Sequence, residues 1–185
     1  MITNDTPTWD IDPTHSGVHF SVRHMVVAKV RGRFTAFGGT IAFDESAPER
    51  SSVDVRIETA SVDTGVPQRD GHLRSPDFFD VENFPAITFQ SRRVEKTAEG
   101  FRVTGELTVR DTTRQVVLPV EYAGRTRDPW GGERAGFSAR LTIDRKDFGL
   151  TWNQLLETGG VAVGDKVEIE LEVEAVKAVP AAAAA

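Results

Sequence analysis

Residues 69–80 of the chain, RDGHLRSPDFFD, hold its densest group of side chains suited to catalysis. Asp70 and His72 are close enough in sequence for the carboxylate to orient the imidazole as a general base. Such a pair at the mouth of a binding site would suit a hydrolase or an isomerase. A triad also needs a nucleophile, and the chain has neither a cysteine nor a G-x-S-x-G nucleophile elbow.

The same stretch has a simpler structural interpretation. Gln68 or Asp70 could cap a short helix whose Leu73 faces an apolar interior. Phe78 and Phe79 would then close the rim of that interior or line a pocket within it. Because no nucleophile and no paired second carboxylate can be recognised, we favour this interpretation and predict that the protein is not an enzyme.

The four histidines do not match a known metal-binding pattern. His15 and His19 are four residues apart, which on a strand spans about 13 Å, too far for one metal ion. The chain contains no H-E-x-x-H motif and no cysteine, so a thiolate zinc site and a disulfide are both excluded. We therefore predict neither a metal site nor a resident cofactor.

Composition limits the partners of the chain. Its 185 residues suffice for one domain with a sizeable core, and its net charge of −6 argues against nucleic acid and anionic membrane surfaces as partners. No stretch approaches the roughly 20 apolar residues of a transmembrane helix. No secretory signal is visible at the N-terminus, so we expect a cytoplasmic protein. This composition is also compatible with a homodimer.

Period-two alternation dominates the chain and predicts strands. In KVEIELEVEA, residues 166–175, Val167, Ile169, Leu171 and Val173 share one face, and the four glutamates between and after them form a solvated second face. Seven further segments alternate in the same way: residues 18–22, 32–44, 53–57, 87–89, 101–109, 116–122 and 137–143.

Two longer gaps and one irregularity interrupt this pattern. Residues 61–85 contain the RDGHLRSPDFFD stretch, and in the gap 149–165 the residues 152–157 suit one or two helical turns. A phase slip near Gly38 and Gly39 predicts a bulge or a bend. About eight strands with short connections favour antiparallel pairing, in either a sandwich or a closed barrel.

Several motifs resemble one known family. WDIDPTHSGVHFSVRH (9–24), GRFTAFGGTIAFD (32–44), RDGHLRSPDFFDVENFPAITFQS (69–91), GELTVRDTTRQVVLPVEY (105–122) and GFSARLTIDRKDFGL (136–150) occur in the order found in the YceI family of lipocalin-like, polyisoprenoid-binding proteins. The resemblance covers residues 9–175. It implies an all-β, extended eight-stranded antiparallel barrel with one or two short helices and an apolar pocket for a long isoprenoid or a related lipid.

On this basis we expect the barrel to span residues 9–177, after a flexible N-terminus (1–8) and before a disordered Ala-rich tail (178–185). His24 shares the parity of its apolar neighbours, so it would point inward, either as a hydrogen-bonded core residue or toward the polar head of a ligand. Parity and the rim interpretation together predict the following ligand-binding residues: Phe20, His24, Phe34, Phe43, Val55, Ile57, Leu73, Phe78, Phe79, Phe89, Leu107, Leu118, Phe137 and Leu141.

Three functional hypotheses follow from the sequence. The first is a barrel that stores or transports a polyisoprenoid, an isoprenoid quinone or a related lipid. The second is the hydrolase or isomerase that uses Asp70 and His72. The third is an interaction module with a solid core, since eleven phenylalanines and three tryptophans would fill a core as well as line a pocket.

Overall fold

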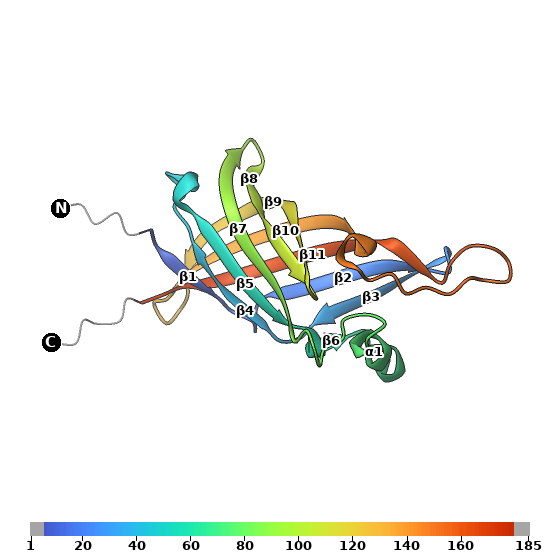
Figure 1. The fold of residues 1–185 in the computed structure, drawn as a ribbon. Coiled ribbons are helices and arrows are strands. Elements are labelled where there is room, and N and C mark those ends of the chain that lie inside the picture. Colours follow the sequence, from blue (N-terminus) through green and yellow to red (C-terminus); the bar gives the residue numbers. More distant parts are fainter. Residues whose placement is uncertain (1–5, 180–185) are drawn as a thin grey trace.

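The computed structural model describes residues 6–179 as a closed antiparallel barrel (Figure 1). The predictions of a flexible N-terminus and a disordered tail fall, for residues 1–5 and 180–185, outside the described residues. The strands are β1 (Thr8–Ile11), β2 (Gly17–His24), β3 (Ala28–Phe34), β4 (Phe37–Ala42), β5 (Ser52–Glu58), β6 (Val62–Asp63), β7 (Ala86–Thr97), β8 (Gly100–Val109), β9 (Thr112–Arg127), β10 (Glu133–Asp144) and β11 (Val163–Lys177).

Eleven segments make eight barrel strands, because three of the strands are interrupted. β11 pairs with β1 near its end, at Ala175, and with β2 along its first part, so β1 and β2 are halves of one long strand. β3 and β4 form a second broken strand, and β5 and β6 a third. The pairing of β1 with β11 closes the ring, which confirms the eight-stranded antiparallel barrel.

Alternation places the apolar face of each strand inside the barrel. On β11 the glutamates point outward, where Glu168 pairs with Lys29 at 2.6 Å and Glu170 with Arg140 at 3.2 Å. Ala175 on the opposite face is fully buried. The glutamate face is thus a solvated surface with cross-strand ion pairs, as the sequence predicts.

One α-helix is present among the described residues, α1 (Pro67–Arg74), within the first long gap. Three 3-10 turns complete the secondary structure: η1 (Pro48–Arg50), η2 (Thr59–Ser61) and η3 (Arg145–Phe148). No helix in residues 6–179 is long and apolar enough to cross a membrane.

Two local predictions are wrong. Residues 152–157 form no helix, because the guanidinium of Arg145 binds the carbonyls of Leu150 and Trp152 and holds this segment in an extended path. Gly38 and Gly39 pair regularly with β5. The break between β3 and β4 lies earlier, at residues 35–36. Gly39 instead serves close packing, since a Cβ there would collide with the carbonyl of Asp54.

The break between β1 and β2 is organised by the carboxylate of Asp12. It accepts hydrogen bonds from the Thr14 amide at 2.9 Å, from the Thr14 hydroxyl at 2.6 Å and from Arg134 at 2.9 Å. Arg134 also donates to Asp128 and Glu174. The hydrogen bonds from Thr14, then those from His15 and Arg134, hold the pKa of Asp12 well below its usual range.

This network predicts an acid-sensitive contribution to stability. Because the folded pKa of Asp12 lies below its unfolded value, the ionised carboxylate stabilises the fold above about pH 4, and this stabilisation is lost as the pH falls toward the folded pKa. We expect Asp12→Asn to lower Tm at pH 7 and to flatten the loss of Tm on acidification. Thermal melts across pH measure both effects, with exposed Asp147→Asn as the control. Equal acid slopes in Asp12→Asn and the wild type would contradict this prediction.

Candidate functional site: an apolar cavity inside the barrel

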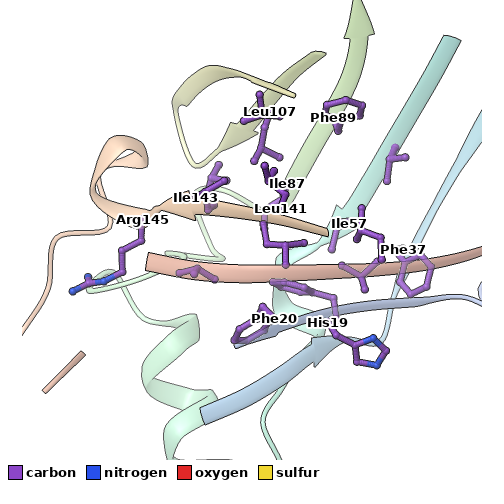
Figure 2. A pocket seen from close by; sticks show the side chains of 18 of the residues that line it. His19, Phe20, Phe37, Ile57, Ile87, Phe89, Leu107, Leu141, Ile143 and Arg145 are labelled. Carbon is purple, nitrogen blue, oxygen red and sulfur yellow. The ribbon is translucent and has the colours of Figure 1, made fainter. Parts of the chain in front are cut away.

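The barrel encloses one large cavity of about 730 Å³, within the usual range for small-molecule sites. Its wall is formed by aliphatic and aromatic side chains from nearly every strand (Figure 2). Leu107, Ile87, Leu141 and Ile143 point into the same space from different strands, as Figure 2 shows. All fourteen residues predicted from the sequence to bind a ligand line this cavity.

The interior is hollow, contrary to the solid-core alternative. Val55, Leu118 and Leu171 point inward, and yet they are only half-buried. Side chains in a filled core would be covered by their neighbours. Their remaining exposure is therefore toward the cavity.

One end of the cavity is closed by an aromatic cluster. Phe43 packs edge-on against Phe101 and Phe137, each with ring centroids 5.3 Å apart, and against Tyr122 at 5.0 Å. Burial raises the pKa of the Tyr122 hydroxyl, with a smaller effect from Glu45. Trp9 and Ile41 belong to the same cluster of buried residues and close this end of the barrel.

The other end is partly covered by α1 and the residues that follow it, and we call residues 66–84 the lid. Leu73, Phe78 and Phe79 of the lid pack into a second core cluster together with Phe34. The Phe79 ring meets Phe34 edge-on at 5.6 Å. The lid interpretation of this stretch therefore agrees with where the structure places its apolar side chains.

Asp70 and His72 do not form a pair. The Asp70 carboxylate is buried and accepts the Thr64 amide at 2.9 Å and the Thr64 hydroxyl at 2.5 Å. His72 instead bonds to Asp77, at 2.9 Å, and its ring packs edge-on against Trp152, with centroids 4.6 Å apart. The two groups required by the hydrolase or isomerase hypothesis are thus engaged with different partners.

The charges of the lid fix it to the barrel. Arg74 donates to the carbonyls of Ala60 and Val62, each at 2.8 Å, and Arg69 donates to the hydroxyl and carbonyl of Thr64.

The prediction that Gln68 or Asp70 caps α1 is wrong, because Val66 is the N-cap residue and no side chain caps the helix. Asp70 reaches back past the helix start to Thr64 instead.

The Asp70–Thr64 contact predicts a specific lid variant. Asp70→Ala leaves the Thr64 amide and hydroxyl without their acceptor, which should cost about 1–3 kcal/mol of lid stability. We expect release of a bound apolar dye, followed by stopped-flow fluorescence, to become about tenfold faster as the lid opens more often. Asp77→Ala, which removes an exposed carboxylate of the lid that pairs with His72, is the matched control. Equal release rates for both variants would contradict this role.

The cavity reaches the surface beside the lid. Its exposed lining residues beside the lid are Val66 and Gln68 of the lid itself and Gln154 of the loop before β11, and half-buried His24 of β2 lines the cavity there as well. Lining residues at the aromatic end, such as Phe43 and Ser51, are buried or half-buried. The opening between β2, the lid and the loop is the mouth of the cavity.

The histidines occupy separate places. His24 is half-buried and lines the cavity near its mouth, as its parity predicts, whereas the imidazole of His19 points away from the cavity (Figure 2). His15 lies beside Asp12 and Glu174, with potential ligand atoms within 4.8 Å of one another. Arg134 binds both of these carboxylates, so a guanidinium already provides their counter-charge.

Sequence reasoning missed several residues of the site. Trp152, Phe148 and Leu150 line the cavity, and Arg145 donates hydrogen bonds to the carbonyls of Leu150 and Trp152. They lie in η3 and in the loop before β11, where no period-two pattern assigns a face. The apolar types in the run from Phe148 to Trp152 are the only sequence signal that could have drawn attention to them.

Comparison with known proteins places this barrel in a family. Residues 9–175 match the YceI-like domain. Protein YceI of Salmonella newport is 39% identical over 168 residues, which cover 91% of this chain and 85% of the relative. A UPF0312 protein of Yersinia enterocolitica is 41% identical over 169 residues, with the same coverage of 91% and 85%.

Solved structures share the architecture. BcnA of Burkholderia cenocepacia superposes with a TM-score of 0.77 at 26% identity, covering 89% of this chain and 98% of that one. The Campylobacter jejuni YceI protein gives 0.72 at 32% identity, covering 85% and 90%. A polyisoprenoid binding domain from Saccharophagus degradans, implicated in plant cell wall breakdown, gives 0.68 at 16% identity, covering 92% and 98%, and shares the fold.

Proposed function

The chain belongs to the YceI-like domain family, and on this premise we propose that its barrel binds one long apolar molecule, such as a polyisoprenoid, an isoprenoid quinone or a related lipid, for storage or transport. The observation that carries the proposal is the cavity of about 730 Å³ with an almost wholly apolar wall, closed at one end and open at the other. A neighbour with the same fold is described as a polyisoprenoid binding domain.

The chemistry of the wall fits a hydrocarbon chain. Each methylene transferred from water into the cavity contributes about 0.8 kcal/mol, so a chain of several isoprene units binds tightly without a charged clamp. Aliphatic and aromatic side chains such as Val55, Leu107 and Phe89 line the middle of the cavity. An apolar ligand leaves no buried polar group there without a partner.

Polar side chains line the mouth of the site, whereas Ser51 lies at the aromatic end. His24, Gln68 and Gln154 line the cavity where it opens, and His24 is half-buried. A ligand with an alcohol, quinone or phosphate head would place its chain toward the aromatic end and its head beside these side chains. The proposed orientation is therefore tail inward and head at the mouth.

A dye titration tests the proposal. N-phenylnaphthylamine fluoresces strongly only in apolar surroundings, so we expect saturable uptake with one dye per chain and displacement by geranylgeraniol. Glycerol, which has hydroxyl groups but no long hydrocarbon chain, is the control and should displace no dye. Absence of saturable dye uptake by protein stripped of bound lipid would refute the proposed function.

A further inference from the structure

Exposed apolar side chains gather at the mouth of the cavity. Among residues 6–179, eight large apolar residues are exposed, and five of them lie in segments at the mouth end of the barrel. We call these five the apolar tip: Met25, Val26, Val27, Val66 and Leu155. Val26 is 69% exposed, and Val27 and Leu155 are each 82% exposed. Water contact with so many neighbouring apolar groups is unfavourable, and such gatherings mark interaction surfaces.

Two segments of the tip project together from the barrel. The turn between β2 and β3 and the loop before β11 extend past the ends of the other strands, away from the start of β1 (Figure 1). They are joined by a hydrogen bond from the Met25 amide to the Ala162 carbonyl at 2.9 Å. The tip is thus a convex projection rather than a groove.

The backbone of the turn is strained in order to hold this shape. Met25 has φ +47° and Val26 φ +66°, a conformation that glycine and asparagine adopt readily and a β-branched residue does not. Such strain costs of order 1–3 kcal/mol and is found at functional sites. A turn that served folding alone would be better formed with glycine or asparagine at position 26.

Basic side chains lie along β2 and β3, the two strands that lead to the turn of the tip. Residues 17–34 contain Arg23, Lys29, Arg31 and Arg33 and no acidic residue, although the whole chain has a net charge of −6. The four share the outer face of β2 and β3, where Arg23 is the register partner of Lys29. Glu168 of β11 pairs with Lys29, and Asp63 of β6 pairs with Arg33. Arg23 and Arg31 form no ion pair within residues 6–179.

From these observations we infer that the mouth end of the barrel docks on an anionic lipid bilayer. The apolar tip inserts at the level of the acyl chains, while the basic residues on β2 and β3 meet the phosphate groups of the lipid heads. A convex apolar tip backed by cations has the chemistry of an interfacial membrane anchor, and each cation near an anionic surface adds about 1 kcal/mol.

Docking in this way would place the cavity mouth against the membrane. The lid residue Val66 lines the cavity and the loop residue Leu155 follows the lining residue Gln154, so a lipid could pass between bilayer and cavity without crossing water. The inference rests on the proposed function for its purpose, because only an apolar cargo needs such a path. The binding of the tip to lipid is measurable without any cargo.

Vesicle co-sedimentation tests the inference. The lipid-stripped protein is mixed with phosphatidylcholine vesicles, with and without phosphatidylglycerol, at low and high salt. We expect binding to the vesicles with phosphatidylglycerol and weakening at high salt, because ionic screening shortens the reach of the basic residues. Val26→Asn with Leu155→Ser should lower the partition coefficient by about tenfold or more. Asparagine tolerates the backbone conformation at position 26, so this double variant should keep its fold.

Two variants serve as matched controls. Trp130→Ser removes an exposed aromatic ring from the turn between β9 and β10, at the end of the barrel opposite the mouth, and should bind vesicles like the wild type. Arg31→Ser should weaken binding about fivefold, whereas Arg140→Ser, on an exposed part of β10, should not.

The dye titration separates the possible failures. If the wild type binds dye but no vesicle, or if the tip variant binds vesicles as well as Trp130→Ser does, the docking inference is wrong and the proposed function stands. The exposed tip would then belong to a protein contact. If the wild type binds vesicles but takes up no dye, the docking stands and the proposed function fails.

Discussion

Val55→Trp with Leu141→Trp should weaken the binding of an apolar dye by about a hundredfold without unfolding the barrel. The two residues lie on β5 and β10 and line the cavity from separate parts of the ring. Two indole rings in this space would displace roughly four methylenes of ligand, about 3 kcal/mol of burial. Because the rings fill an empty volume, we expect Tm to be unchanged or higher.

The control for this experiment is the same substitution in a filled part of the interior. Ala175 is fully buried between Ile11 of β1 and Ala135 of β10. Ala175→Trp should lower the free energy of unfolding by about 3 kcal/mol or more, because packed interiors do not accept added volume. Equal loss of Tm in both experiments would indicate a solid interior and contradict the hollow barrel. Dye titration and thermal melts measure the two properties.

Arg145→Leu should lower the free energy of unfolding by about 3 kcal/mol, the largest stability effect we expect from a single charged residue. The Arg145 side chain is 5% exposed. It donates to the carbonyls of Leu150 at 2.6 Å, Trp152 at 2.9 Å and Gly164 at 2.8 Å. Leucine matches the apolar surroundings but leaves these buried acceptors without donors, so the loop before β11 should lose its fixed path.

Exposed Arg140 provides the comparison for Arg145. It lies on β10, the strand that leads into η3, and pairs with Glu170 at 3.2 Å. Arg140→Leu should change the free energy of unfolding by no more than about 0.5 kcal/mol. Urea denaturation of both variants measures the difference. Hydrogen exchange should also become faster in residues 149–162 of Arg145→Leu, because Arg145 fixes that segment. A loss of less than about 1 kcal/mol for Arg145→Leu would show that the loop is held by other contacts.

The strands could be predicted from the sequence because their inner and outer faces differ in polarity. Residues 167–174 of β11 show this most clearly, since their valine, isoleucine and leucine side chains face the cavity and their glutamates face solvent. The same rule placed His24 on the inner face of β2. Parity depends only on the geometry of one strand, so it holds without any knowledge of the strand's neighbours.

Features that depend on distant partners could not be predicted. The path of residues 152–157 is determined by the side chain of Arg145, and the ends of β3 and β4 are set by pairing with β6 and β5. The Asp12 network joins residues that are more than one hundred positions apart in sequence. No local pattern carries this information.

In the candidate site, too, features of a single strand could be predicted and features that depend on distant residues could not. The alternation of apolar and polar residues identified side chains that line the cavity. It could not distinguish a hollow interior from a filled one, because both give the same alternation. The mouth was also hidden, since Trp152 and the apolar tip lie in turns and loops. The net charge of −6 likewise concealed the basic residues gathered on β2 and β3.

The central claim is that the cavity holds one apolar molecule, and native mass spectrometry tests it most directly. The protein is purified without detergent, stripped with organic solvent, incubated with geranylgeraniol and measured beside Val55→Trp with Leu141→Trp. We predict a mass increment of one geranylgeraniol per wild-type chain and none in the double variant. A wild-type spectrum that shows only the unliganded mass, or an equal increment in the double variant, would contradict the account.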